Sequence, residues 1–246
     1  MACEIGTIIC SLNFDVFIYA LLGGVLPALL WLWFWLHEDA GHREPRSLIV
    51  LTFMVGMAMV LLAAPVEKLV IVVGRLFNPS FTEGMLMAVV IWAGVEEIFK
   101  YIAARLTAFK HVAFTRPIDA FIYITTASLG FSAMENTLFL LSPLLKGDTF
   151  AAVIGGSLRF MGASLLHFLA SGVIALCVGL TFYASRAKKA LGLLVGLIIA
   201  VALHTLFNFF IIGNEKQHTF LVFSSVWILV IFLTISIERV KTIKNF

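Results

Sequence analysis

Long apolar stretches separated by short polar connections dominate the chain, and their lengths predict its architecture. Seven stretches are long enough to cross a bilayer as helices, at about 13–37, 48–64, 84–105, 118–142, 157–183, 190–212 and 218–238. A hydrocarbon core about 30 Å thick requires roughly 17 or more apolar residues in a helix. The pattern predicts an all-α membrane protein, a polytopic bundle of seven transmembrane helices. The count becomes eight if the short apolar piece Leu69–Phe77, expected to lie at the interface, also crosses.

Composition agrees with a lipid bilayer as the solvent. Hydrophobic residues make up 61% of the 246 residues and charged residues 13%, whereas soluble domains contain about a quarter charged residues. The connections are short and no internal repeat is present, so we expect 1–246 to form a single transmembrane domain with a motif-bearing core at about 84–212. The net charge of +3 says little about nucleic acid, and no basic cluster is large enough to argue for it, so we expect no nucleic acid partner.

Lysine and arginine residues gather in alternate connections, which predicts an orientation. If the N-terminus is outside, the inner segments contain 11 of these residues and the outer segments four. Cytoplasmic loops carry the excess of positive charge in membrane proteins. We therefore expect a multi-pass protein of the cell (plasma) membrane with its N-terminus outside and its C-terminus in the cytoplasm. Because Met1–Ser11 lacks the basic residues of a signal peptide, the first span is expected to be retained.

A small set of polar side chains interrupts the apolar spans. A charge at mid-bilayer costs at least about 2.5–3.5 kcal/mol on insertion scales, so each needs a reason to be there. Glu96 and Glu97 share a helix face with Lys100, and His204 shares one with Asn208. The whole set comprises Glu96, Glu97, Lys100, Glu135, Asn136, Arg159, His167, His204 and Asn208.

These polar groups also share a depth. A rise of about 1.5 Å per residue places Glu96, Glu135, His167 and His204 about 10–16 Å from the outer end of their spans, and Asn208 about 6 Å. Groups from four helices therefore fall in one layer, in the central to outer half of the membrane. Depth alone does not show that their helix faces converge.

Such a layer contains the groups of a hydrolase that activates water. A carboxylate can act as general base, and histidine and asparagine can donate hydrogen bonds to an oxyanion. Ser164 and Ser171 flank His167, but small hydroxyl residues commonly pack between membrane helices, so neither is expected to be a nucleophile. We expect no metal and no other cofactor. Zinc stays the alternative, because Glu and His are zinc ligands even without an H-E-x-x-H motif.

Four motifs then resemble those of a known family in their order along the chain. Glu96-Glu97-Ile98-Phe99-Lys100 resembles the EExxK signature of the PrsW family, and Phe131–Asn136 resembles its FxxxEN motif. His167 and the stretch His204–Asn208 resemble the third and fourth motifs. The resemblance covers about 92–210, and although any one motif is weak, four in order are specific.

The resemblance implies an intramembrane endopeptidase of the glutamate type, related to the CaaX proteases and bacteriocin-processing enzymes. It implies that Glu96 activates water, that Glu135 assists it, and that His204 or His167 stabilises the oxyanion with Asn208. CaaX enzymes have histidine where this chain has Glu135, so that role transfers less directly. The implied catalytic residues are Glu96, Glu97, Glu135, His167, His204 and Asn208, supported by Lys100 and Asn136.

The resemblance also implies a membrane-anchored protein or peptide as substrate. The best-known substrate of the family is an anti-sigma factor, which receives its first cut on the extracytoplasmic side. Two alternatives to a glutamate protease stay open: a metal-dependent intramembrane protease, and a proton or ion transporter, because buried Glu and His also relay protons. A catalytically inactive scaffold would tolerate every polar substitution. Asp119 and Arg159 are interpreted as structural.

Overall fold

The computed structural model describes residues 14–38, 44–212 and 219–243. All regular secondary structure in these residues is helical. The predicted all-α class is confirmed for these residues. The stretch Met1–Ser11 and part of the connection between His37 and Arg46 lie outside them. In chain order the elements are α2 (Phe14–Glu38), α3 (Arg46–Phe77), α4 (Leu86–Thr107), α5 (Pro117–Leu145), α6 (Thr149–Leu158), the π-helical turn η1 (Arg159–Ala163), α7 (Ser164–Leu180), α8 (Arg186–Ile212) and α9 (Thr219–Lys241).

Five helical segments of the described residues are long and apolar enough to cross a membrane. They are Phe14–His37, Arg46–Phe77, Thr149–Leu180, Arg186–Ile211 and Phe220–Lys241. The chain is therefore a multi-pass membrane protein. The helices α4 and α5 fall outside this set and contain most of the buried polar side chains, which lower the hydropathy of a segment. The predicted count of seven spans stays a prediction for these two helices.

The piece Leu69–Phe77 does not form a separate interfacial segment. It is the C-terminal part of α3, which continues through Pro65 as one helix. Membrane helices tolerate an internal proline because neighbouring helices and local adjustments satisfy the freed backbone groups. The α6, η1 and α7 segments likewise form one continuous helical stretch, which begins at Thr149 rather than at the predicted residue 157.

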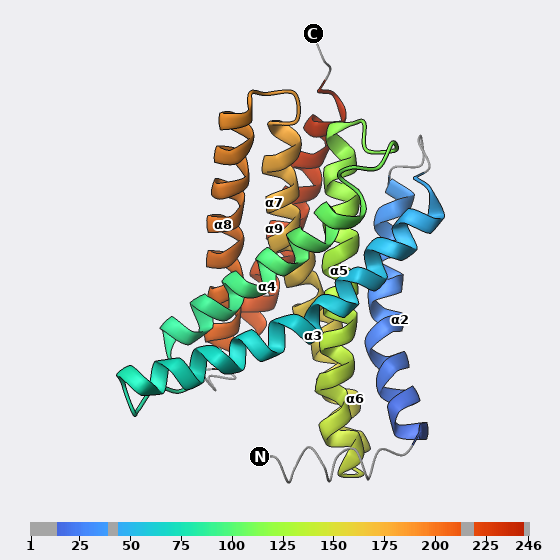
Figure 1. Ribbon diagram of the computed structural model, residues 1–246. Coiled ribbons are helices and arrows are strands. Elements are labelled where there is room, and N and C mark those ends of the chain that lie inside the picture. Colours follow the sequence, from blue (N-terminus) through green and yellow to red (C-terminus); the bar gives the residue numbers. More distant parts are fainter. Residues whose placement is uncertain (1–13, 39–43, 213–218, 244–246) are drawn as a thin grey trace.

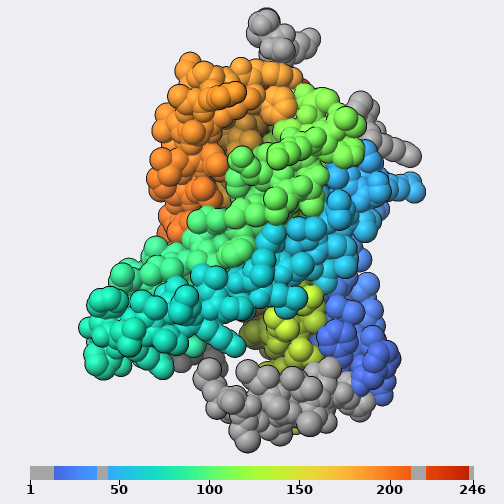
Figure 2. All heavy atoms as spheres, viewed as in Figure 1, coloured from blue at the N-terminus to red at the C-terminus, as the bar shows by residue number. Residues whose placement is uncertain are grey.

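The upright helices of the bundle are crossed by an inclined pair. Figure 1 shows α5, α7, α8 and α9 running roughly along one axis, with α3 and α4 lying across them side by side. The space-filling view shows that this pair projects beyond the other helices on one side (Figure 2). The loops after α4 and α7 and the end of α9 lie at one end of the bundle, whereas the turn between α5 and α6 lies at the opposite end (Figure 1).

The helix α5 forms the centre of the bundle, and it is buried on all sides from Pro117 to Ala133. Two glycines bring α3 directly against its backbone. A Cβ atom at Gly56 would overlap the carbonyl oxygen of Ala127, and one at Gly130 would overlap the carbonyl oxygen of Phe53. Small residues allow this close approach in membrane helix packing. The crossing also sets the position of α4, which packs on α3.

An ion-pair cluster ties the start of α5 to the start of α3. Arg116 Nη2 lies 2.7 Å from Glu44 Oε1 and 2.9 Å from Asp119 Oδ1, and the Tyr123 hydroxyl donates to Glu44 at 2.6 Å. Asp119 also accepts hydrogen bonds from the backbone N–H groups of residues 115 and 116, which caps α5. These contacts support the structural interpretation of Asp119.

Candidate active site

The carboxylates of α4 converge on one lysine inside the bundle. Lys100 is fully buried, and its Nζ donates to Glu97 Oε1 at 2.7 Å, to Glu96 Oε2 at 3.2 Å and to His167 Nδ1 at 2.7 Å. An ammonium group has three hydrogens and no acceptor, so these partners use its whole capacity. The predicted sharing of one helix face by Glu96, Glu97 and Lys100 is confirmed.

The two glutamates differ in how far they are enclosed. Glu97 is fully buried and accepts hydrogen bonds from Lys100, from Ser171 Oγ at 2.8 Å and from His204 Nδ1 at 2.9 Å. The Glu96 side chain keeps 11% of its surface exposed, and Lys100 is its only hydrogen-bond partner among the described residues. Of the two carboxylates, Glu96 therefore has the capacity to accept a further hydrogen bond.

Two histidines bring α7 and α8 to these carboxylates. Their rings lie 5.0 Å apart, and both are almost completely buried. His167 Nδ1 accepts from Lys100, so the ring hydrogen belongs on Nε2, which lies 2.8 Å from Glu135 Oε2. His204 Nδ1 faces Glu97 and must therefore carry hydrogen. The nitrogens nearest Glu96 Oε2 are His204 Nε2 at 3.7 Å and His167 Nδ1 at 3.8 Å.

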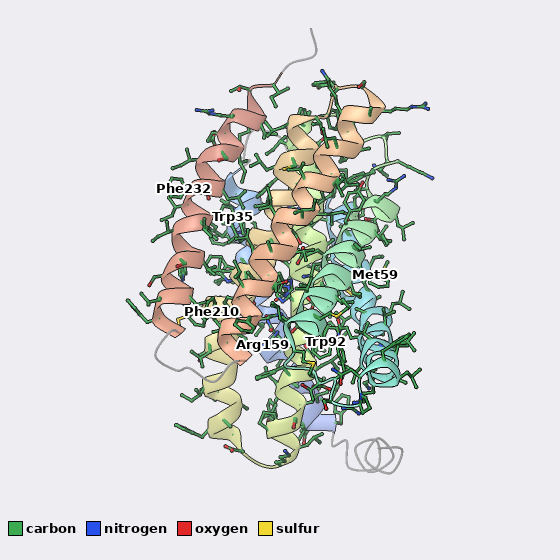
Figure 3. The ribbon with its side chains drawn as sticks, turned by 90° about the vertical axis from the view of Figure 1, so that its left-hand side faces the viewer. Trp35, Met59, Trp92, Arg159, Phe210 and Phe232 are labelled. Atoms are coloured by element: carbon green, nitrogen blue, oxygen red, sulfur yellow. The ribbon has the colours of Figure 1, made fainter. Side chains whose placement is uncertain are left out.

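A third group of polar contacts joins α5 to the π-helical turn. Arg159 Nη2 lies 2.6 Å from Glu135 Oε1, and Arg159 Nε donates to Asn136 Oδ1. Asn136 Nδ2 donates to Ser164 Oγ at 3.0 Å. Figure 3 places Arg159 among the helices, at about the level of Trp92 and Phe210. The π-helical turn therefore places Arg159 beside the cluster, in contact with both Glu135 and Asn136.

Most of the predicted site residues meet in one cluster, and two findings differ from expectation. Asn208 is partly buried one turn beyond His204, and within the described residues its side chain forms no hydrogen bond. Glu67 lies beyond the predicted second span, 48–64, but it is half-buried within α3. It lies close enough to Glu96 and Glu135 for their charges to interact. Sequence reasoning missed Glu67 because Pro65 suggested that the helix ended before it.

Three donors of the cluster lie close enough together to hold a metal ion, for which zinc is the chemical alternative. Glu96, His167 and His204 each offer one ligand atom, and these atoms lie within 4.8 Å of one another. In each histidine, the ring nitrogen farther from Glu96 faces another carboxylate. His167 Nε2 faces Glu135, and His204 Nδ1 faces Glu97. Carboxylates of this kind orient metal-binding histidines, so the residues fit a zinc ion. Lys100 opposes it, because its ammonium group already contacts His167 Nδ1.

Comparison with known proteins agrees with this geometry. Residues 44–235 match the family described as PrsW family intramembrane metalloprotease. The curated protein Protease PrsW of Halalkalibacterium halodurans is 25% identical over 226 residues, covering 90% of this chain and 95% of the relative. Protease PrsW of Oceanobacillus iheyensis is 27% identical over 200 residues, covering 78% and 83%. Protease PrsW of Bacillus subtilis is 21% identical over 190 residues, covering 76% and 79%.

No solved structure matches this chain. The family match extends from the start of α3 nearly to the end of α9, and so includes all the helices that build the polar cluster. The motifs, the buried cluster and the extent of the match lead to one conclusion. The chain belongs to the PrsW family of intramembrane proteases.

Proposed function

We propose that this protease hydrolyses a peptide bond of a membrane-anchored protein with a water molecule that Glu96 activates. The observation that carries the proposal is the difference between the two glutamates. Glu97 is fully buried and held by three donors, whereas Glu96 retains exposed surface and unused acceptor capacity. A general base must reach water or substrate, and of the α4 carboxylates Glu96 meets that requirement.

The other residues of the cluster take supporting roles in this mechanism. Glu96 removes a proton from water, the resulting hydroxide attacks the peptide carbonyl, and the proton passes to the leaving amine. Glu97 holds His204 through Nδ1, which leaves Nε2 as the nitrogen on the side of Glu96. With hydrogen on both nitrogens, the His204 ring can donate to the oxyanion, and Asn208 on the same helix face is the second proposed donor.

Glu135 and His167 form the other side of the site. His167 lies between Lys100 and Glu135, and Arg159 holds Glu135 from the opposite direction. The Glu135 side chain is 32% exposed, against 11% for Glu96, so it lies nearer the opening of the cluster. We assign Glu135 to orienting the attacking water or carrying its proton.

A metal-dependent form of the same protease is the second candidate. The convergence of Glu96, His167 and His204 favours it, as does the description of the family as a metalloprotease. A bound zinc ion would polarise the peptide carbonyl and activate its own water. The contact between Lys100 Nζ and His167 Nδ1 disfavours it, because a metal at that nitrogen would displace the ammonium group and repel it.

The orientation and the substrate belong to the same proposal. We place the N-terminus outside, the C-terminus in the cytoplasm, and the cut on the extracytoplasmic side of an anti-sigma factor or similar substrate. The basic residues at the end of the bundle that contains the loops after α4 and α7 support this orientation. Alkaline phosphatase fused after Lys146 should be active in cells, and the same enzyme fused after Lys110 should be inactive. The opposite pattern would reverse the orientation.

Cleavage of a single-span anti-sigma substrate by the purified protein in liposomes tests the mechanism. Glu96→Gln should abolish cleavage, whereas Glu238→Gln, an exposed carboxylate on α9, should leave it unchanged. Activity that survives extensive chelation supports the glutamate mechanism. Activity that chelation removes and zinc restores, together with about one bound zinc per chain by elemental analysis, would establish the metal candidate instead. A Glu96→Gln protein that cleaves like the wild type would disprove both.

A further inference from the structure

A cavity with basic side chains lies at one end of the bundle, away from the active site. It has a volume of about 670 Å³ and is formed by the end of α4, the loop that follows it, the end of α7 and the start of α8. Four basic side chains line it: Arg105, Lys110, Arg186 and Lys189. The lining contains no carboxylate, and among the described residues none of these four side chains forms an ion pair.

Three carboxylates toward this end of the bundle, among the residues that the structure describes, already have basic partners. Glu44 and Asp119 pair with Arg116, and Glu238 pairs with Lys241. The four basic side chains of the cavity repel one another with no carboxylate in the lining, and an anion placed among them would relieve that repulsion. The first turn of α8 begins at Arg186, and its free backbone N–H groups add further positive potential on the same side.

One wall of the cavity is aromatic. Phe109 stacks on Phe114 with 4.5 Å between ring centroids, Phe114 lies 5.5 Å from Phe182, and Lys189 Nζ stands 5.8 Å from the Phe182 ring. A small inorganic anion would bind the basic side chains without contacting these aromatic rings. A ligand that combines an anionic group with apolar parts would contact both the rings and the basic side chains.

An exposed apolar surface on α8 adjoins the basic cavity. Below the cavity, α8 presents Leu191, Leu194 and Ile198 with more than half of each side chain exposed. The cavity therefore lies where a membrane-crossing helix passes from basic to apolar residues, which is the depth of lipid headgroups. Anionic headgroups bind in basic pockets between membrane helices on the cytoplasmic side.

We propose that this cavity binds the phosphate-bearing headgroup of an anionic phospholipid. The basic side chains pair with the phosphate, the aromatic wall contacts the glycerol region, and the acyl chains lie along the exposed apolar face of α8. The charges alone would also accept a soluble phosphate compound, but the aromatic wall and the apolar face favour the lipid. The site lies outside the catalytic cluster and does not depend on the mechanism proposed for it.

Titration of the detergent-solubilised full-length protein with phosphatidylglycerol or phosphatidylcholine tests the proposal, with bound lipid counted by native mass spectrometry. The pocket variant is Arg186→Gln/Lys189→Gln. The matched control, Lys188→Gln/Arg239→Gln, removes the same charge at the same end from residues that do not line the cavity. The pocket variant should bind phosphatidylglycerol about thirty-fold more weakly, if each basic residue contributes its usual attraction to an anionic headgroup. The control should bind like the wild type.

A charge-retaining variant keeps the test valid if the pocket variant folds poorly. Arg186→Lys/Lys189→Arg should restore binding to within a few-fold of the wild type. Equal losses in the pocket and control variants would overturn the proposal, because diffuse surface charge would then explain the binding. Equal binding of the two lipids would overturn it as well. Displacement of phosphatidylglycerol by an equal concentration of glycerol 3-phosphate would assign the cavity to a soluble phosphate compound instead.

Discussion

Replacement of Lys100 by methionine should destabilise the protein far more than loss of any exposed lysine. The substitution keeps an unbranched apolar stem but removes the ammonium group that pairs with Glu97 at 2.7 Å and with Glu96 at 3.2 Å. Both carboxylates would then lie buried without a cation. Loss of one partner of a buried ion pair lowers the free energy of unfolding by about 3–5 kcal/mol, because the remaining charge is buried without a counter-charge.

The expected change is large enough to measure in detergent. For a chain of this size, about 1 kcal/mol corresponds to a shift of roughly 2–4 °C in unfolding temperature, so Lys100→Met should lower it by roughly 10 °C. Intrinsic tryptophan fluorescence during heating measures the shift. Lys188→Met is the matched control, because Lys188 is exposed on α8 and forms no ion pair within the described part of the chain.

A second substitution identifies the cause. Adding Glu97→Gln to Lys100→Met removes the carboxylate that lies closest to the lysine, and the double variant should regain part of the lost stability. Such coupling is what a double-mutant cycle detects for contacting residues. The reasoning is refuted if Lys100→Met unfolds at the same temperature as Lys188→Met. It is also refuted if the double variant is less stable than Lys100→Met, since the uncompensated carboxylate would then not be the source of the loss.

Two further predictions concern the crossing of α3 with α5 and the arginine of the π-helical turn. Gly130→Ala would press a methyl group against the carbonyl oxygen of Phe53 and should lower the yield of folded protein in size-exclusion chromatography. Gly94→Ala, which meets only ordinary van der Waals contact, should leave it unchanged. Arg159→Gln should slow cleavage about tenfold to a hundredfold through the loss of its pairing with Glu135, as expected for a residue that orients a catalytic group. Initial rates measure this loss, and an unchanged rate would remove Arg159 from the site.

Local periodicity explains what could be predicted about the site. Glu96, Glu97 and Lys100 lie within four residues on one helix, so their contact follows from helix geometry. Asn208 shows the limit of the same reasoning. Asn208 shares a helix face with His204, yet of these two residues only His204 contacts a carboxylate of the described part of the chain. Contact with another helix depends on rotation and depth as well as spacing.

The backbone conformation around Arg159 could not be predicted for a related reason. The sequence around it predicts an ordinary span, and a π-helical turn has no clear signal in hydrophobic periodicity. The turn adds a residue to the helix and changes the direction of the side chains on either side of it. Glu67 was missed because a proline in an isolated sequence suggests a break, whereas a packed membrane helix can continue through it.

Three features followed from the amino-acid sequence alone: that this is a helical membrane protein, where most of its helices lie, and which rare polar residues lie inside them. Apolar length and the cost of buried charge are properties of the chain and the bilayer, and they need no knowledge of packing. The packing of the helices was needed to show which ring nitrogen faces which carboxylate and which glutamate keeps more free acceptor capacity. It was also needed to find the cavity whose basic side chains have no ion-pair partner in the described part of the chain. These features depend on how helices cross, and at α3 and α5 that crossing is set by Gly56 and Gly130, whose missing side chains let two backbones touch.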